Sequence, residues 1–292
     1  MTDLIDILQA NLFVFVSITF LFSLFVGSFL NVVIYRLPLM MERDWKQQCE
    51  ELAGKKHAEH MPEETFNLVL PRSRCVHCGH QIRAYENIPI LSYLLLRGRC
   101  SNCHSKISLR YPFVELLTAV LSATVAWQFG FGWQALAAII LTWALIALTF
   151  IDLDHKLLPD SITLPFLWIG LLLSLGNVFV DPATSIVGAV AGYLSLWLVY
   201  QGFKIVTGKE GMGFGDFKLL AMLGAWVGWK YLPVIILFSS AVGAVTGIAL
   251  VAVGKRQRGA AIPFGPFLAA AGWLTVLWGE NIVSTYLNLV RS

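Results

Sequence analysis

Two aspartates stand at points where long apolar runs of the sequence begin or end. Asp152 ends one run, and Asp216 opens another directly after Gly213-Phe-Gly215. Ionisable residues at the edge of a membrane segment are costly, so they are candidates for function. Two carboxylates held close together share a proton, and such a pair can hydrolyse an amide. The sequence therefore predicts a catalytic pair of Asp152 and Asp216, with helix caps or interfacial anchors as the alternative.

The expected helix ends suggest a division of labour between the two aspartates. Asp216 is expected at a helix amino terminus, where free N–H groups and the helix dipole favour a carboxylate. Asp152 is expected at a helix carboxyl terminus, where the dipole favours the protonated acid. We therefore predict Asp216 as the resting base and Asp152 as the resting acid. Asp154 and Asp160 are interpreted as caps or supporting groups, and Lys218 as an anchor.

The polar segment between Arg36 and Tyr111 contains all five cysteines of the chain. Four of them form two Cys-x-x-Cys pairs separated by about twenty residues, a spacing typical of zinc sites. They are Cys75, Cys78, Cys100 and Cys103. Four thiolates complete the tetrahedron that zinc prefers and leave no position for a reacting water, so we expect a structural metal. Disulfides or redox dithiols are the alternative, and they are rare in the reducing cytosol, where this segment is expected.

The composition indicates a membrane protein, because 57% of the 292 residues are hydrophobic and only 13% are charged. Seven apolar runs approach the roughly 20 residues needed to cross a bilayer. They cover residues 12–35, 113–131, 134–151, 162–180, 184–206, 232–253 and 263–280. An eighth run, residues 217–229, is shorter. It is interpreted as a tilted crossing, a half-helix or a segment buried among its neighbours.

Positive charge decides the topology, because Lys and Arg in short loops are retained on the cytoplasmic side. If residues 217–229 cross the bilayer, the loop with Lys255, Arg256 and Arg258 lies on the same side as the large polar segment. We therefore predict an all-α integral membrane protein with about eight transmembrane helices and both termini on the periplasmic side. Its expected parts are a first transmembrane helix (1–35), a small cytoplasmic zinc-binding insert (36–112) and a multi-span membrane domain with the aspartates (113–292).

Several longer motifs occur in order along nearly the whole chain. They are the two cysteine pairs and residues 27–38, 86–93, 110–115, 151–160, 211–218 and 262–266. In these motifs the chain resembles the type IV prepilin peptidases, in the bifunctional form that acts as prepilin leader peptidase and N-methyltransferase. Members of that family serve type IV pili and type II secretion in Gram-negative bacteria.

The resemblance implies a specific activity at the cytoplasmic face of the bacterial inner membrane. It implies that prepilins and pseudopilins are cut after a glycine, before their apolar helix, and that the new amino terminus, usually Phe, is methylated with S-adenosylmethionine. The catalytic aspartates of the family match Asp152 and Asp216, and its cysteine tetrad matches the four cysteines above. Secretion or pilus-assembly proteins are further expected partners besides the lipid bilayer. No nucleic acid partner is expected. No residue is assigned to S-adenosylmethionine, because the sequence contains no glycine-rich turn of a nucleotide-binding fold.

Three other interpretations stay open at this point. The Gly-x-Gly-Asp turn before Asp216 is also compatible with a general intramembrane protease that has no methyltransferase activity. Acidic residues in a multi-span bundle, with a broken segment at residues 217–229, also occur in transporters. Finally, the zinc insert could serve mainly as a docking platform for secretion or pilus proteins, with catalysis confined to the membrane part.

Overall fold

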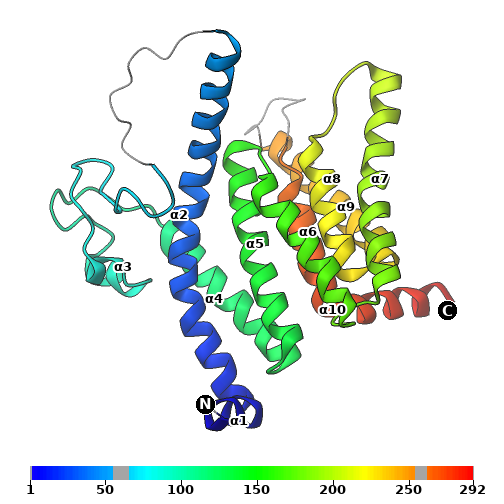
Figure 1. The fold of residues 1–292 in the computed structure, drawn as a ribbon, viewed down its shortest axis with the longest axis horizontal. Coiled ribbons are helices and arrows are strands. Elements are labelled where there is room, and N and C mark those ends of the chain that lie inside the picture. Colours follow the sequence, from blue (N-terminus) through cyan, green and yellow to red (C-terminus); the bar gives the residue numbers. More distant parts are fainter. Residues whose placement is uncertain (1, 55–65, 254–261, 292) are drawn as a thin grey trace. The chain divides into compact units, whose positions relative to one another are not determined.

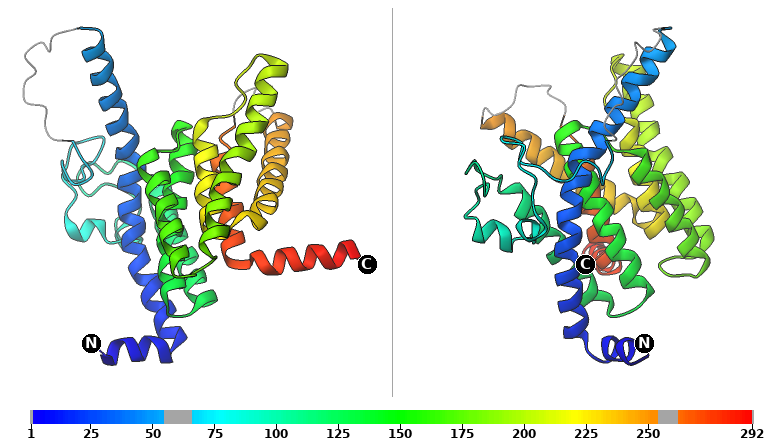
Figure 2. Two further views of the ribbon diagram at one scale, coloured as in Figure 1. Left: turned by 45° about the vertical axis from the view of Figure 1, so that its right-hand side comes forward. Right: turned by 60° about the vertical axis from the view of Figure 1, so that its left-hand side comes forward.

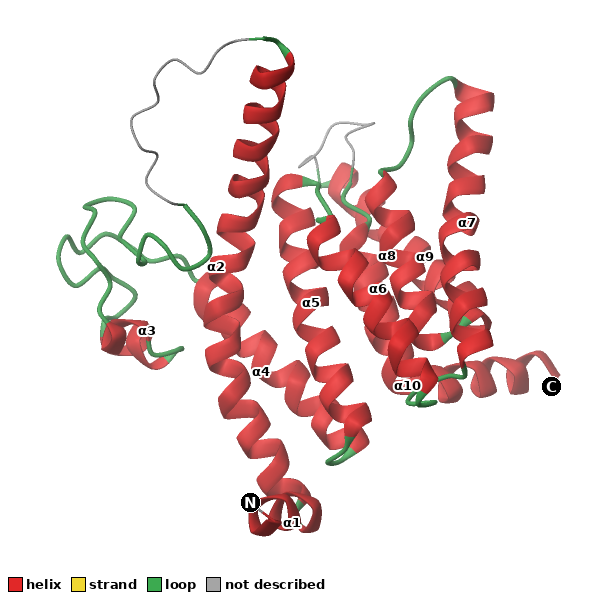
Figure 3. Cartoon of the chain, in the orientation of Figure 1, coloured by secondary structure: helices red, strands yellow, loops and turns green. Residues whose placement is uncertain are grey.

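The computed structural model of this chain describes residues 2–54, 66–253 and 262–291. Within these ranges every named element of secondary structure is a helix (Figure 3), and the loops contain two isolated β-bridges. The all-α prediction is confirmed. The chain divides into two compact units, Met1–Phe131 and Gly132–Ser292. We describe each of them by itself.

The first unit is built on one long helix and a shorter helix that packs along it (Figure 1). Its elements are α1 (Thr2–Ala10), α2 (Leu12–Leu52), the 3-10 helix η1 (Ala84–Asn87), α3 (Leu91–Leu95) and α4 (Arg110–Phe129). The backbones of α2 and α4 meet at Gly27, where a Cβ atom would stand 2.6 Å from the Cα atom of Glu115. One turn further along, the Asn31 side-chain amide donates to the carbonyl of Tyr111 over 3.1 Å. Only a glycine permits this helix–helix distance.

Buried Arg36 fixes the start of the polar segment on α2. Its guanidinium donates to the carbonyls of Asn67 (2.9 Å) and Pro71 (2.6 Å). The fork of an arginine suits two acceptors at once, so a single side chain holds the returning chain against the helix. Helix α2 itself continues past Pro38 to Leu52, so the predicted helical arm begins as an extension of the first apolar helix. Residues 55–65 of that arm lie outside the described residues.

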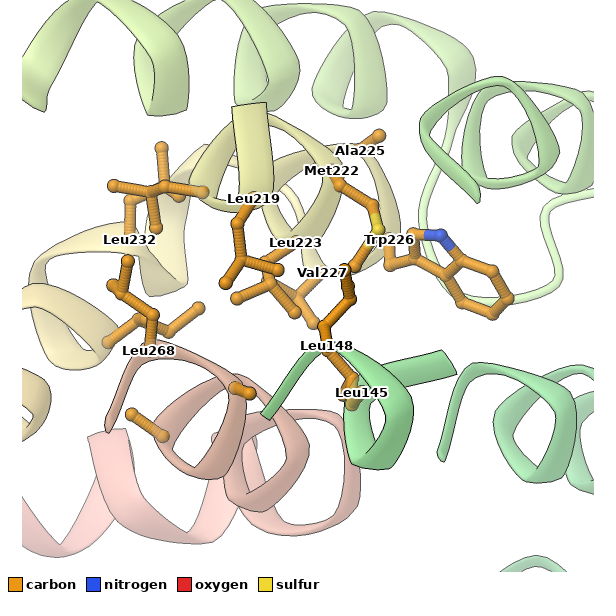
Figure 4. Close-up of a cluster of buried hydrophobic side chains, with 14 of the residues drawn as sticks. Leu145, Leu148, Leu219, Met222, Leu223, Ala225, Trp226, Val227, Leu232 and Leu268 are labelled. Atoms are coloured by element: carbon orange, nitrogen blue, oxygen red, sulfur yellow. The ribbon is translucent and has the colours of Figure 1, made fainter. Parts of the chain in front are cut away.

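The second unit is a bundle around a short buried helix, α8. Its elements are α5 (Trp133–His155), α6 (Asp160–Leu175), α7 (Pro182–Thr207), α8 (Phe214–Val227), the 3-10 helix η2 (Trp229–Tyr231), α9 (Leu232–Ala252) and α10 (Gly265–Arg291). Helices α6, α7 and α10 all pack on α8. Figure 4 shows Leu148 of α5 and Leu268 of α10 in the same buried cluster as the apolar side chains of α8. Because α8 is covered by its neighbours, apolar residues occupy nearly all of its faces.

Small residues allow α7 to lie directly against α8. Gly188 and Gly224 face each other so closely that a Cβ atom on either would overlap the carbonyl of the other. The Ser185 hydroxyl donates to the carbonyl of Ala225 over 2.6 Å. Close backbone contact between small residues, with a hydrogen bond across the helices, is how membrane helices associate without a hydrophobic driving force.

Five helices in the described part of the chain are long and apolar enough to cross a membrane: α2, α4, α5, α7 and the stretch from η2 through α9. Each of the eight predicted apolar runs coincides with a helix. Helix α8 has 14 residues, which gives a length of about 21 Å, less than the roughly 30 Å of a hydrocarbon core. It is also enclosed by its neighbours, and its crossing of the bilayer stays a prediction. Lys255, Arg256 and Arg258, on which the topology argument depends, lie outside the described residues.

The last helix of the chain is bent. Trp278 has non-helical backbone angles (φ −133°, ψ 19°) inside α10. Beyond it, the C-terminal part of α10 turns away from the other helices of the second unit (Figure 1, Figure 2). The first part of α10, which starts at Gly265, lies in the packed bundle, and residues beyond the bend still contact the start of α9.

Candidate active site and metal centre

Asp152 lies in the last turn of α5 with its side chain turned into the second unit. Helix α5 ends three residues later, where Lys156 adopts the left-handed conformation (φ 53°) and donates its N–H to the carbonyl of Asp152 over 2.9 Å. Only 5% of the Asp152 surface is exposed. Its Oδ2 atom accepts the N–H of Gly265, at the first residue of α10, over 3.0 Å. A helix start is thus directed at this carboxylate.

Asp216 lies in the first turn of α8, behind the N-cap residue Gly213. Only 8% of Asp216 is exposed. The next residue, Phe217, is fully buried and packs against the rings of Tyr193 and Tyr200 of α7, with centroids 5.8 and 5.7 Å away. This aromatic contact fixes the rotation of α8 and so sets the direction of the neighbouring Asp216, which lies about 100° away around the helix axis.

The starts of the two helices next to the aspartates meet around one loop residue, Leu158, which follows α5. A Cβ atom added to Gly215 would stand 2.8 Å from the Cβ atom of Leu158. A Cβ atom added to Gly265 would stand 3.1 Å from Leu158 Cδ2 and 2.7 Å from Asp152 Oδ2. The starts of α8 and α10 therefore lie on either side of Leu158. Asp152 is close enough for its charge to act on Asp216. The structure brings the predicted pair into one buried cluster, and their catalytic role stays a prediction.

Two residues of this cluster were not identified from the sequence as members of the site. Gly265 supplies the N–H donor to Asp152, and Leu158 separates the helix starts. The donor also bears on the predicted roles, because an N–H at the start of α10 opposes the effect of the carboxyl end of α5 on Asp152. The carboxyl end of α5 favours a protonated Asp152, and the N–H of Gly265 favours an ionised one. The assignment of Asp152 as resting acid therefore stays a prediction. The only sequence signal was the Pro-Phe-Gly-Pro motif that ends at Pro266.

The other boundary residues have separate positions. Lys218 forms an ion pair with Asp160 over 2.6 Å and thus joins the first turn of α6 to that of α8. Asp154 is exposed on the final turn of α5. Glu115 belongs to the first unit, where it lies buried on α4.

The four predicted metal ligands form a compact cluster in the first unit. Their sulfur atoms all lie within 4.8 Å of one another. The Sγ atoms of Cys75 and Cys103 are 3.8 Å apart, and those of Cys78 and Cys100 are 4.0 Å apart. Tetrahedral zinc with Zn–S bonds of about 2.3 Å needs sulfur atoms roughly 3.8 Å apart. The donor set and its spacing therefore fit a zinc ion.

The two halves of this cluster are turns with the same hydrogen bonds. Cys75 donates its N–H to the carbonyl of His80 (2.8 Å), and Cys100 donates to Ser105 (2.9 Å). The residue four positions after each first cysteine, Gly79 (φ 70°) or His104 (φ 57°), is left-handed and donates back to the cysteine carbonyl. Each turn thereby directs its two thiols to the same side. The sequence spacing predicted this arrangement because both turns are local.

The local environment favours the thiolate form of two of these cysteines. Backbone N–H groups of Cys78 and His77 lower the pKa of the Cys75 thiol to about 6. The hydroxyl of Ser105 lowers the pKa of Cys103. Because the thiolate is the form that binds metals, these donors support a metal site. The fifth cysteine, Cys49, is exposed on α2 and is not part of the cluster.

Comparison with known protein families gives two matches. The model described as "Bacterial Peptidase A24 N-terminal domain" matches residues 21–129, and the "Type IV leader peptidase family" matches residues 139–248. These matches define the class of protein: a bacterial A24 peptidase in which two family models match successive segments. No solved structure matches the chain.

Similar proteins with a curated name specify the family further. A protein of Stutzerimonas stutzeri is 54% identical and covers 98% of this chain and 99% of its own length. One of Pseudomonas aeruginosa is 55% identical with 98% of each chain covered, and one of Aeromonas salmonicida is 52% identical over 99% and 100%. All three are named "Prepilin leader peptidase/N-methyltransferase". The chain belongs to the prepilin leader peptidase/N-methyltransferase family.

Proposed function

We propose that this chain removes the leader peptide of type IV prepilins and type II secretion pseudopilins and then methylates the new amino terminus. The names of its relatives describe a peptidase and an N-methyltransferase. The observation that carries the peptidase activity is the buried cluster in which Gly215, the residue before Asp216, and Gly265, the donor to Asp152, both lie against Leu158. S-adenosylmethionine would supply the methyl group.

Peptide hydrolysis by the pair requires one ionised and one protonated carboxyl group. The ionised group takes a proton from water while the water oxygen attacks the scissile carbonyl carbon, and the protonated group gives its proton to the carbonyl oxygen. The tetrahedral intermediate then loses its C–N bond. During this step the proton taken from water passes to the leaving nitrogen, and a hydroxyl proton returns to the other carboxylate. Both aspartates thus end in their starting states.

The backbone around the pair leaves space for an extended substrate. A Cβ atom on Gly213 would have only one described neighbour within 4 Å, the Asp216 carboxylate at 3.9 Å. Gly215, in contrast, is closed off by Leu158. A substrate strand could therefore approach Asp216 along Gly213, where no side chain intervenes.

The proposed metal is a structural zinc ion held by Cys75, Cys78, Cys100 and Cys103. Four thiolates leave no coordination position for water, so the ion would stabilise the polar insert and take no part in hydrolysis. The insert has few buried apolar residues among its described positions, which is the situation in which small modules depend on a metal.

The proposed topology has eight crossings, an insert at residues 36–112 on the cytoplasmic side of the inner membrane, and both termini in the periplasm. It also keeps residues 1–35 as the first crossing and residues 113–292 as the membrane domain. Five apolar helices support a multi-pass protein. Asp152 ends α5 and Asp216 opens α8, so an opposite direction of these helices would put both carboxylates near one membrane face.

The direct test uses purified full-length protein in lipid with a prepilin, and follows leader removal and amino-terminal methylation separately. We expect Asp152→Asn and Asp216→Asn each to abolish cleavage, because neither half of the pair can act alone. The matched control is Asp154→Asn, two residues along α5 and exposed. Cleavage at the wild-type rate by either cluster variant would refute the proposed site.

The same assay separates the remaining alternatives. A general intramembrane protease would cleave without methylating, and a transporter would show neither activity. To test the insert as a platform, residues 66–109 would be deleted. Unchanged cleavage and methylation would then make it a docking surface for secretion or pilus-assembly proteins. We expect loss of methylation at least, since the zinc knuckles lie in this segment.

A further inference from the structure

The first unit contains a cavity of about 470 Å³ that is formed by residues of this unit alone. Helix α2, helix α4 and the segment with the zinc knuckles surround it. Pockets for small molecules have volumes of roughly 300–1,000 Å³. The cavity is therefore large enough for one nucleoside-sized ligand, and the two catalytic aspartates, which belong to the second unit, do not line it.

Two charged groups of its wall are buried, Arg36 of α2, whose guanidinium donates to backbone carbonyls, and Glu115 of α4. Only 7% of Glu115 is exposed, and one carboxylate oxygen accepts the N–H of Ile90 over 2.7 Å. Among the described residues, no Lys or Arg forms an ion pair with it. A buried carboxylate without a cation is costly, because hydrogen bonds alone replace little of its hydration. Glu115 thus has the character of a binding group for a cationic ligand.

The backbone that faces Glu115 is strained. Ile90 has positive φ (58°, with ψ −49°), a conformation that a β-branched residue rarely adopts. Such strain persists only where the surrounding structure enforces it, and it is concentrated at ligand clamps and active sites. Here it directs the N–H of Ile90 at the Glu115 carboxylate and holds that carboxylate in one orientation.

Other parts of the wall fit the remaining groups of a nucleoside with an amino-acid tail. Tyr35, Tyr93 and Tyr111 line the cavity and offer aromatic faces for a purine ring. Arg74 also lines it and could pair with a carboxylate. His80 lines it too, and its Nε2 atom lies 3.6 Å from a carboxylate oxygen of Glu86. Purine, carboxylate and cation occur together in S-adenosylmethionine.

We infer that this cavity is the binding site of the methyl donor, with Glu115 facing its cationic sulfonium end and the tyrosines holding its adenine. The inference rests on the proposed methyltransferase activity and adds the site, which the sequence did not identify. In the transfer, the neutral amine of the substrate forms a bond to the methyl carbon while the carbon–sulfur bond breaks with its electrons on sulfur. The donor becomes a neutral thioether, so Glu115 would favour the donor over the product.

This difference in charge gives a test that does not depend on activity. The dissociation constants of S-adenosylmethionine and S-adenosylhomocysteine would be measured by equilibrium dialysis on full-length protein in lipid. We expect Glu115→Gln to weaken binding of the cationic donor about tenfold or more, and of the neutral product less than about threefold. Gln keeps an acceptor for Ile90, and Glu50→Gln, an exposed change on α2, is the matched control expected to alter neither constant.

A second measurement uses the wild-type protein and needs no variant. Ultraviolet cross-linking of radiolabelled S-adenosylmethionine, followed by peptide mapping, should label segments 86–93 or 110–115. Label in the second unit, or equal loss of both ligands in Glu115→Gln, would overturn the site while methylation by the wild type kept the proposed function. Wild-type protein that neither binds the donor nor methylates would instead refute the function itself.

Discussion

Replacement of Gly265 by alanine tests whether the start of α10 positions the carboxylate of Asp152, which we propose to be catalytic. The added methyl carbon would stand 2.7 Å from Asp152 Oδ2 and 3.1 Å from Leu158 Cδ2, while ordinary contacts begin at 3.4 Å. The methyl group and the oxygen must therefore separate by about 0.7 Å. Either α10 moves away or the Asp152 side chain rotates, and both lengthen the 3.0 Å hydrogen bond from Gly265.

The expected loss of activity follows from that hydrogen bond. A hydrogen bond to a charged group contributes about 1.5–3 kcal/mol, and each 1.36 kcal/mol corresponds to roughly a tenfold change in rate. A displacement of about 1 Å at a reacting group can by itself lower the rate about a hundredfold. We therefore expect kcat/KM for leader cleavage to fall between about tenfold and a hundredfold in Gly265→Ala.

The assay compares Gly265→Ala with Gly202→Ala. Gly202 lies on α7 with no heavy atom within 4 Å of an added Cβ, so alanine there should leave cleavage unchanged and favour the helix. Methylation of a peptide that has already lost its leader would be measured in parallel as a check on the rest of the protein. Cleavage by folded Gly265→Ala at the rate of the control would show that Asp152 is not held by α10, and the reasoning would be wrong.

Three further outcomes are expected. Gly224→Ala should destabilise the second unit by about 2 kcal/mol, since a methyl group would overlap the carbonyl of Gly188, and thermal unfolding in lipid would measure it. Lys218→Met should cost less than about 1 kcal/mol by the same assay, because its ion pair with Asp160 is partly exposed, and a total loss of cleavage would instead make it a site residue. Cys75→Ser should remove bound zinc. In the wild type, the lowered pKa of Cys75 favours the thiolate above about pH 6, and because metal and proton compete for the sulfur, metal should be lost only at a pH below that value.

The features that could be predicted from the sequence are those set by neighbouring residues. Both cysteine turns form within six residues, so the spacing of Cys75 and Cys78 was enough to predict that their thiols converge. The helices follow from the apolar runs for the same reason. The approach of Asp152 to Asp216 was predicted from their shared position at helix ends, and the structure places both in one cluster.

The features that the sequence did not reveal depend on contacts between distant segments. The donor to Asp152 comes from Gly265, 113 positions away. Glu115 was recognised as a boundary carboxylate, but its cavity requires α2, α4 and the knuckle segment to be packed together. The positive φ of Ile90 has no local signal either, because β-branched residues rarely adopt it, and the conformation is accompanied by the contact with the distant Glu115.

The short helix α8 explains why the position of Asp216 depends on packing more than on hydropathy. At 14 residues the helix is too short to be fixed by the bilayer alone, and its apolar residues on all sides give no amphipathic face to orient it. Its rotation is instead set by Gly188 of α7 against Gly224 on one side and by the contacts of Phe217 at its start. If this is so, a bulky residue at Gly188 should lower cleavage as strongly as a change beside the carboxylates, although Gly188 lies about two turns of α8 or more from Asp216.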